Sequence, residues 1–398
     1  MTRTSGKHDG TDFSLVKGGL LYRLFRFLKV AGEDRLGVLR RIILFFLLAW
    51  LPLIILSVAE GTAINGRLDI PFFLDLGANI RIMAAVPLFL IGEIPVDRWL
   101  KEVVEYMRRS GLVPDKARPA FDDAIRKVSL LRDSVVPELV LFLPVIVLFL
   151  VGPALDLPEG ITSWKATDRA GTQFTLAGWW YALVSLPIYQ FLHLRWLWRF
   201  VIWAYFLWRL ARLPLQILPT HPDRTGGLGF MTVGHSTFSL VIFASSSVVA
   251  ASLAEQIMVA HASLFDFQVL IATYVVLVLV VVLAPLCFFS PVLSAAKRRG
   301  LSSYATLIDQ HHRLFAEKWF RARDDKESGS ESILGNPDAS SLADINSGYE
   351  AVHKMTILVV TPRLVIDFAR AAVLPMAPLV LTVIPFRELL KKLAGLLM

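Results

Sequence analysis

The chain has 398 residues, of which 55% are hydrophobic and 19% are charged. Soluble proteins carry about 25% charged residues, so this composition indicates a membrane protein, and ordinary Gly and Pro usage excludes collagen-like or low-complexity chains. The single cysteine, Cys287, excludes an intrachain disulfide and a cysteine-rich metal site. A positional excess of Lys and Arg around membrane spans explains the net charge of +8, so we expect no nucleic-acid partner.

A basic amphipathic helix is predicted near the N-terminus, over residues 13–30. Apolar residues lie beside basic ones there, namely Phe13, Leu20, Leu24 and Phe27 beside Lys17, Arg23, Arg26 and Lys29. This pattern is typical of a helix that lies in the headgroup region of a bilayer. Anionic lipid headgroups are therefore expected partners.

Seven apolar stretches are long enough to span a bilayer, which takes about 20 helical residues. In chain order they are 42–58, 80–96, 136–155, a stretch that begins at 178, 238–258, 267–293 and 364–386. Three prolines interrupt the last stretch, so six spans followed by a re-entrant segment are the alternative. The predicted fold class is an all-α integral membrane protein, a polytopic helical bundle of about seven spans with additional cytoplasmic helices.

The distribution of Lys and Arg predicts the orientation of these spans. Thirty-four of these residues fall in the segments 1–41, 97–135, 194–237 and 294–370, and only three fall in the loops between them. Because positively charged segments stay on the cytoplasmic side, we expect a cytoplasmic N-terminus. A helical pattern continues beyond the fourth span. In it Arg195, Arg199 and Arg209 share one face, as expected for a helix that lies along the inner membrane interface.

The alternation of predicted spans with segments rich in Lys and Arg also divides the chain into six parts. They are a cytoplasmic N-terminus (1–41), the first two spans (42–96), a cytoplasmic helical hairpin (97–135), spans three to six with a cytoplasmic connection at 194–237 (136–293), a cytoplasmic helix with a flexible linker at 326–348 (294–363), and the last span with its tail (364–398). Glu93, near the inner end of the second span, is expected to pair locally with Arg98.

A compact turn over residues 221–230 is the most distinctive motif. It contains His221, Asp223, Arg224, Gly226, Gly227 and Gly229. Glycines permit a positive φ and close backbone approach, so one interpretation is an anion-binding turn whose amides and Arg224 hold a phosphate. The other interpretation is a rigid structural turn in which Asp223 bonds local amides. It has neither the preceding strand nor the following lysine of a P-loop.

Four segments carry a resemblance to a known group of proteins. They are HPDRTGGLGF (221–230), AKRRGLSSYATL (296–307), LGNPDASSLADI (334–345) and LPMAPLVLTVIPFRELL (374–390). With these segments the chain resembles an uncharacterised family of bacterial multi-pass inner-membrane proteins. The resemblance implies placement in the bacterial inner membrane and implies no mechanism.

The fifth span is unusually polar. Ser245, Ser252 and Gln256 share one helical face, and Glu255 lies at its edge. Small and hydroxylated residues favour close helix packing, whereas the alternative is a hydrated path along this face. An ionisable residue at membrane depth is a candidate functional residue.

The outer loops are acidic, which suggests a mouth that concentrates cations. Glu255 and Asp266 would line this mouth, and His261 between them would make it sensitive to pH. An acidic exterior also follows from the exclusion of positive charge from outer loops. We assign no metal site, no cofactor and no catalytic residue.

Three classes of function remain open. A channel or transporter, possibly for cations, fits the polar fifth span and the acidic mouth. A membrane scaffold or signalling component fits the basic cytoplasmic face, with a cytoplasmic protein or a second copy of the chain as partner. A membrane enzyme acting on lipid or phosphate would have to use His221, Asp223 and Arg224.

Overall fold

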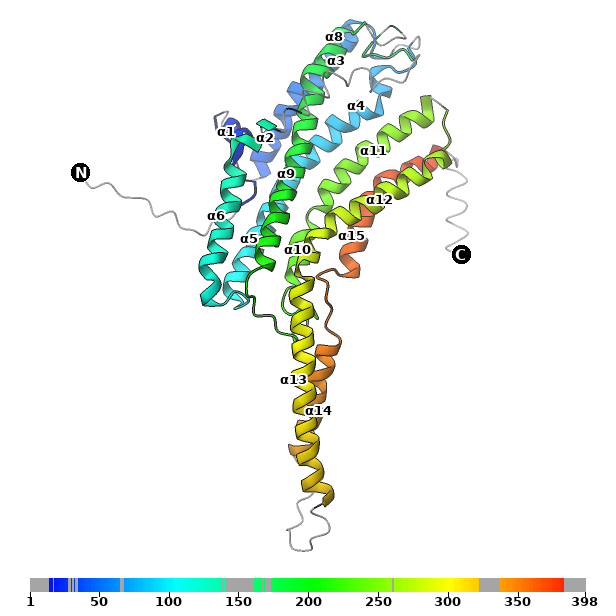
Figure 1. Cartoon of the computed structure of the whole chain (residues 1–398). Coiled ribbons are helices and arrows are strands. Elements are labelled where there is room, and N and C mark those ends of the chain that lie inside the picture. The colour runs from blue at the N-terminus through cyan, green and yellow to red at the C-terminus, as the bar shows by residue number, and fades with distance from the viewer. Residues whose placement is uncertain are drawn as a thin grey trace, which may run out of the picture.

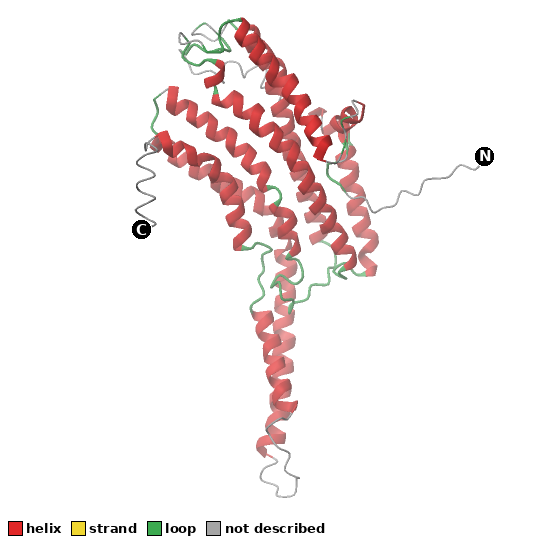
Figure 2. Cartoon of the chain, turned by 180° about the vertical axis from the view of Figure 1, so that it is seen from behind, coloured by secondary structure: helices red, strands yellow, loops and turns green. Residues whose placement is uncertain are grey.

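The computed structural model describes residues 14–16, 18–27, 30, 32, 35–64, 68–137, 139–140, 143, 161–166, 168, 173–259, 261–321 and 337–382. Within these residues the chain is helical and contains no strand, only two isolated β-bridges (Figure 2). This confirms the all-α class.

The helices form a membrane bundle and a projecting stalk (Figure 1). In chain order the bundle contains α1 (Gly19–Phe27), α2 (Arg35–Phe45), α3 (Leu51–Ala59), α4 (Leu76–Ile80), α5 (Val86–Arg109), α6 (Arg118–Asp133), α8 (Leu176–Trp180), α9 (Leu186–Ala211), α10 (Phe230–Ser236), α11 (Ser239–Val259), α12 (Gln268–Leu283) and α15 (Pro362–Val373). The stalk is an antiparallel pair of α13 (Ser290–Ala316) and α14 (Pro337–His353). We call the end of the bundle that bears it the stalk end, and the opposite end the far end.

Within the described residues, five helices are long and apolar enough to cross a membrane. They are Leu36–Ala59, Leu76–Arg109, Phe230–Val259, Leu264–Phe320 and Pro362–Leu381. They contain the predicted first, second, fifth and sixth spans and residues 364–381 of the predicted seventh. The predicted third span lies mostly outside the described residues. The predicted fourth span lies in an unbroken helix over 176–211 that is not among the five, because aromatic and polar residues lower its hydropathy. A polytopic helical membrane protein is thus supported, and the number of seven spans is not established.

The two ends separate the loops as the Lys and Arg pattern predicts. The described loop residues 60–64, 68–75, 161–166, 173–175 and 261–266 lie at the far end, and the 110–117 and 212–229 connections lie at the stalk end (Figure 1). Arg41, near the start of the first span, contacts Glu93 halfway along the second candidate span. The second halves of α5 and α9 therefore extend beyond the apolar layer, where α6 packs on α9.

The predicted flexible linker over 326–348 is wrong for its second half, because residues 337–348 belong to helix α14. Packing against α13 explains the difference. Gly348 lies so close to α13 that an added Cβ would be 2.4 Å from Cε1 of Tyr304. Lys318 pairs with Asp338, and His311 bonds to Ser341. The small residues that suggested a linker instead allow the two helices to approach closely.

Helix α1 is amphipathic, but it is shorter than the predicted 13–30 helix, and Phe27 of the predicted apolar set is 83% exposed. Leu21 and Phe25 are buried against the bundle, whereas Arg23 and Arg26 are exposed. The Arg41 guanidinium lies over the Phe25 ring, so α1 packs at the level where the first span begins. This placement is compatible with a helix at the membrane interface.

Candidate functional site

Three π-helical turns meet inside the bundle. They are Phe46–Trp50, Arg81–Ala85 and Tyr181–Ser185, and the first contacts the other two. Each turn is followed two residues later by a proline, at 52, 87 and 187. Single π-helical turns inside helices are rare and are frequent at functional sites.

Side chains at the third π turn donate hydrogen bonds to backbone carbonyls of the first π turn. Pro52 has no amide hydrogen, so the carbonyl of Leu48 loses its helical donor. The Trp180 indole donates to the Leu48 carbonyl at 3.1 Å, and the Ser185 hydroxyl donates to the Ala49 carbonyl at 2.6 Å. A proline is tolerated in a membrane helix where neighbouring side chains satisfy the backbone carbonyls that it leaves without a donor.

Two of the helices that contain a π turn have their N-cap, π turn and proline at the same spacing. Asp75 and Thr175 cap α4 and α8 with their side chains. In both helices a five-residue α segment, a five-residue π turn and a proline follow at the same spacing. This correspondence over 100 positions was not predicted from the sequence. The N-cap and the proline were its visible signals. Internal structural repeats are found in many transporter folds.

A buried carboxylate, Asp75, lies at the far end, directly before this layer. It is 2% exposed and accepts hydrogen bonds from the Ala78 amide at 2.6 Å and the Trp164 indole at 2.8 Å. Lys165 pairs with it at 2.9 Å. Burial raises the pKa of Asp75, but the charge of Lys165 and these hydrogen bonds outweigh burial and hold the pKa well below its usual range. Asp75 is therefore ionised.

Glu255, near the far end of α11, completes this cluster. Its carboxyl group accepts a hydrogen bond from the Gly77 amide at 2.8 Å and lies close enough to the Asp75 carboxylate for the two groups to interact. A Cβ at position 77 would lie 2.9 Å from Glu255 Oε2, so glycine permits this approach. Two carboxyl groups that share a buried site disfavour each other's ionisation, so one of them holds a proton. Because Asp75 is held ionised by Lys165, the proton belongs to Glu255. We call Asp75 and Glu255 the carboxyl pair.

A second buried cluster lies where the apolar layer ends on the stalk side. Glu93 contacts Arg41 at 2.5 Å, Arg199 at 2.8 Å and Arg195 at 3.5 Å. All four side chains are almost fully buried. The 18 residues from Asp75 to Glu93 correspond to roughly 27 Å of helix, close to the hydrocarbon thickness of a bilayer. The expected local pair of Glu93 with Arg98 does not form, since Arg98 is exposed.

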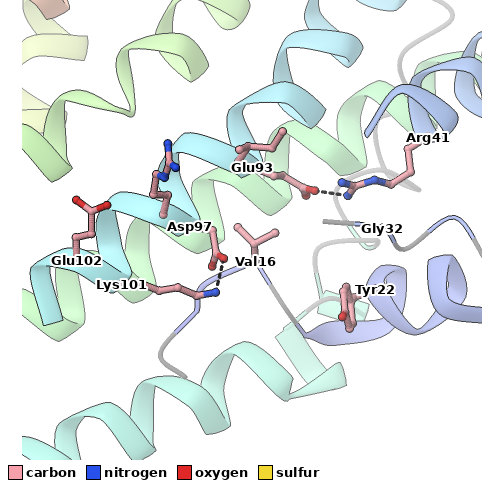
Figure 3. Close-up of a pocket in the computed structure, with 10 residues that line it drawn as sticks. Val16, Tyr22, Gly32, Arg41, Glu93, Asp97, Lys101 and Glu102 are labelled. Carbon is pink, nitrogen blue, oxygen red and sulfur yellow. Dashed lines mark hydrogen bonds and ion pairs between the residues drawn. The ribbon is translucent and has the colours of Figure 1, made fainter. Parts of the chain in front are cut away.

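A polar cavity of about 420 Å³ opens beside Glu93 (Figure 3). Its wall carries charges of both signs, with Lys101 paired to Asp97 at 2.9 Å. Ser14, from the N-terminal segment, also donates to Asp97. The cavity therefore gives water access to the edge of the Glu93 cluster.

Side chains that can donate and accept hydrogen bonds lie between the two clusters. The Arg81 guanidinium donates to the Tyr181 hydroxyl at 2.6 Å. Ser245 lies 3.4 Å from His193, and Ser246 lies 2.9 Å from the Tyr274 hydroxyl. The rings of Tyr189 and His193 lie 5.9 Å apart, measured between their centroids. These side chains come from the facing sides of the helices that contain a π turn and from α11 and α12.

The predicted polar face of the fifth span is divided by the structure. Ser245 lines an apolar groove, Ser252 is half-buried and Gln256 is exposed. Asp266 is exposed and caps a short helical turn through Ser263, whereas Glu255 bonds to Gly77. His261 is exposed and has a φ of 54°. Glu255, Asp266 and His261 serve different elements, and no metal-binding group of three such residues occurs in the part of the chain that the structure describes.

The 221–230 turn is organised by Asp223 itself. Its carboxylate accepts hydrogen bonds from the amides of Thr225, Gly227 and Gly229 at 2.8, 3.1 and 2.8 Å, and His221 lies 2.8 Å away. Burial raises the pKa of Asp223, but these amides hold it below its usual value. The amides that would bind a phosphate are already engaged, so this geometry favours the structural interpretation.

The turn joins the bundle to the stalk. Arg224 (φ 58°) accepts a hydrogen bond from the Thr356 amide at 2.7 Å through its carbonyl. Gly226 (φ 65°) packs against Ile217, where an added Cβ would lie 2.2 Å from Cγ2. Lys297 of α13 donates to the Met355 carbonyl. The turn therefore fixes the base of the stalk.

Substitution of Gly226 by Ala is expected to lower the free energy of unfolding more than the same change at Gly111. Both glycines have a positive φ, but an added Cβ at Gly111 meets nothing within 4 Å. Gly111→Ala measures backbone strain alone, at about 1–3 kcal/mol, and Gly226→Ala adds the clash. Thermal unfolding of the two variants in detergent tests this, and equal losses would show that the turn does not pack as described.

Comparison of the chain with protein-family models, with curated proteins and with solved structures gives no match. The carboxyl pair, the Glu93 cluster and the helices between them are the features of the described residues that bear on function.

Proposed function

We propose that this protein conducts protons across a membrane, with the carboxyl pair as its proton-binding site. The observation that carries the proposal is the approach of the Glu255 carboxyl group to the Gly77 amide, two residues from the buried Asp75–Lys165 pair, at the far end of the spans. Buried carboxyl groups that exchange a proton are the working groups of many proton pumps and transporters. From the sequence we expect a channel or transporter, possibly for cations. Here we propose that the transported cation is the proton.

The proposed route runs between the two buried clusters. A proton enters at Glu255, passes the hydroxyl and imidazole groups of Tyr189, His193 and Ser245, and leaves through the polar cavity beside Glu93. Each of these groups can accept a proton or hydrogen bond and release it again. Glu93 itself stays bound to its three arginines and positions α2, α5 and α9 around the exit.

The activity is tested with purified protein in liposomes that contain a pH-sensitive dye. A potassium gradient with valinomycin supplies the driving potential. The proposal predicts proton uptake faster than in protein-free liposomes of the same lipid. Uptake equal to that of protein-free liposomes would overturn it.

We further propose that the protein lies in a bacterial inner membrane with its N-terminus and stalk in the cytoplasm. The support is the Lys and Arg distribution, with 34 residues in one set of segments and three in the other. Exposed Arg23 and Arg26 on α1 would then face anionic lipid headgroups.

Reporter fusions test this orientation. Fusions after residues 30, 115, 225 and 330 are expected to report a cytoplasmic position, and fusions after 65, 165 and 262 a periplasmic one. A fusion at 398 decides between seven spans and a re-entrant last segment. An internal fusion with the opposite location would contradict the proposed orientation from that point onward.

The stalk supports a second candidate function, a docking platform for a cytoplasmic protein or for a second copy of the chain. Two helices project from the bundle, and Leu314 and Phe320 on them are 67% and 69% exposed. Replacing both residues by Glu would leave proton uptake unchanged and would abolish such an association, measured by light scattering for the second copy. The third class, a membrane enzyme built on His221, Asp223 and Arg224, gains no support from a turn whose amides are already engaged.

A further inference from the structure

Residues of α9, α11 and α12 line a groove on the side of the bundle. Its volume is about 450 Å³, which is within the range of small-molecule sites. Leu197, Leu277 and Val281 line it and are exposed. The groove is at the depth of the apolar spans and has an apolar rim, so it opens towards lipid. We call it the lateral groove.

Two hydrogen-bonding groups in the wall of the lateral groove have no protein partner among the described residues. They are the Tyr189 hydroxyl and Nε2 of His193. Other polar groups in the wall are engaged, since the Tyr274 hydroxyl bonds to Ser246. A polar group in an apolar site that is left without a partner costs free energy, so these two groups select a ligand that bonds to them.

The neighbours of His193 determine what Nε2 can do. The Ser245 hydroxyl donates its single hydrogen to the Val241 carbonyl at 2.9 Å. Its contact with His193 Nδ1 at 3.4 Å is therefore a hydrogen bond in which Nδ1 donates. In a neutral imidazole Nε2 is then an acceptor. The lateral groove thus offers one acceptor, His193 Nε2, and one hydroxyl, Tyr189, that can donate.

We infer that the lateral groove binds a lipid-soluble alcohol or phenol that enters from the bilayer. The ligand hydroxyl donates its hydrogen to His193 Nε2 and accepts a hydrogen bond from Tyr189. Its apolar body lies along Trp196, Phe200 and Phe238, which line the same groove. Aromatic walls favour a ligand with an aromatic ring. Tyr189 and His193 also belong to the proposed proton route, but the inference depends on the geometry of the lateral groove and its binding test does not require proton conduction.

The test compares a phenol with its methyl ether, in which a methyl group replaces the hydroxyl hydrogen. 4-Octylphenol can donate and accept, whereas 4-octylanisole can only accept. Their binding to the full-length protein in lipid nanodiscs is measured by equilibrium partition against empty nanodiscs. We expect wild-type protein to bind the phenol about tenfold more tightly, as one hydrogen bond to a buried acceptor allows. A second pair, 1-dodecanol and its methyl ether, shows whether the aliphatic alcohol is selected in the same way.

Three variants locate the selectivity. His193→Phe should abolish the preference for the phenol over the anisole. Tyr189→Phe should weaken both ligands equally, because both accept its hydrogen bond. Val276→Ala, on an exposed face of α12 outside the groove lining, should change neither. Equal binding of the phenol and the anisole by wild-type protein, or an unchanged preference in His193→Phe that is folded, would overturn the inference.

Discussion

Replacing Glu255 by Gln is expected to reduce proton uptake into liposomes to the level of protein-free liposomes, a loss of at least about a hundredfold. The Gln side chain matches protonated Glu in shape and hydrogen bonding. Its carbonyl oxygen accepts from the Gly77 amide, and its amide group donates to Asp75. The variant therefore keeps the contacts of the far-end cluster but cannot release a proton. Its thermal stability should stay close to that of the wild type.

Asp266→Asn is the matched control for this result. Asp266 is another acidic residue at the far end, but it is exposed and caps a helical turn. Its neutralisation should leave proton uptake within about twofold of the wild-type rate, because exposed charges are largely screened at physiological salt. Loss of uptake in Asp266→Asn together with full uptake in Glu255→Gln would contradict the assignment and restore the acidic mouth predicted from the sequence.

Replacing Glu93 by Gln is expected to be the most destabilising single change in the bundle. The change leaves three buried guanidinium groups, those of Arg41, Arg195 and Arg199, around a neutral side chain. Removing one partner of a buried ion pair costs about 3–5 kcal/mol. We expect low abundance in the membrane and a lower temperature of thermal unfolding in detergent.

Glu105→Gln controls for the substitution itself. Glu105 lies on the same helix, α5, and pairs with Arg109 at the surface. Exposed pairs of this kind contribute less than about 1 kcal/mol, so this variant should unfold close to the wild-type temperature. If the Glu93 and Glu105 variants were equally stable, the Glu93 cluster would not hold the helices together.

Hydropathy and charge predicted the spans that the structure supports, because both depend on composition over 20 residues. The stretches at 42–58, 80–96 and 238–258 fall within candidate spans. The helix α14 was not predicted, since its stability depends on packing against α13 rather than on its own residues. The spacing shared by α4 and α8 was also not predicted, because it is visible only when capping residues and prolines are compared across 100 positions.

The candidate site was predicted in part. Glu255 was selected from the sequence as an ionisable residue in a span, but its partners come from the 75–77 segment and from the loop that contains Lys165. Glu93 was noted, yet its three arginines lie on α2 and α9. No local pattern connects such distant positions, because the contacts arise from the packing of helices. The Asp223 turn was predicted more fully, since its hydrogen bonds span only six residues.

The proton on the carboxyl pair can be observed directly by infrared spectroscopy of the protein in lipid. A protonated carboxyl group has a C=O stretching band that an ionised carboxylate lacks, and the band shifts when hydrogen is exchanged for deuterium. The proposal predicts such a band in wild-type protein under the conditions of proton uptake, its loss in Glu255→Gln and its retention in Asp266→Asn. A spectrum in which folded wild-type protein and Glu255→Gln show the same carboxyl bands would contradict the assignment of the proton to Glu255.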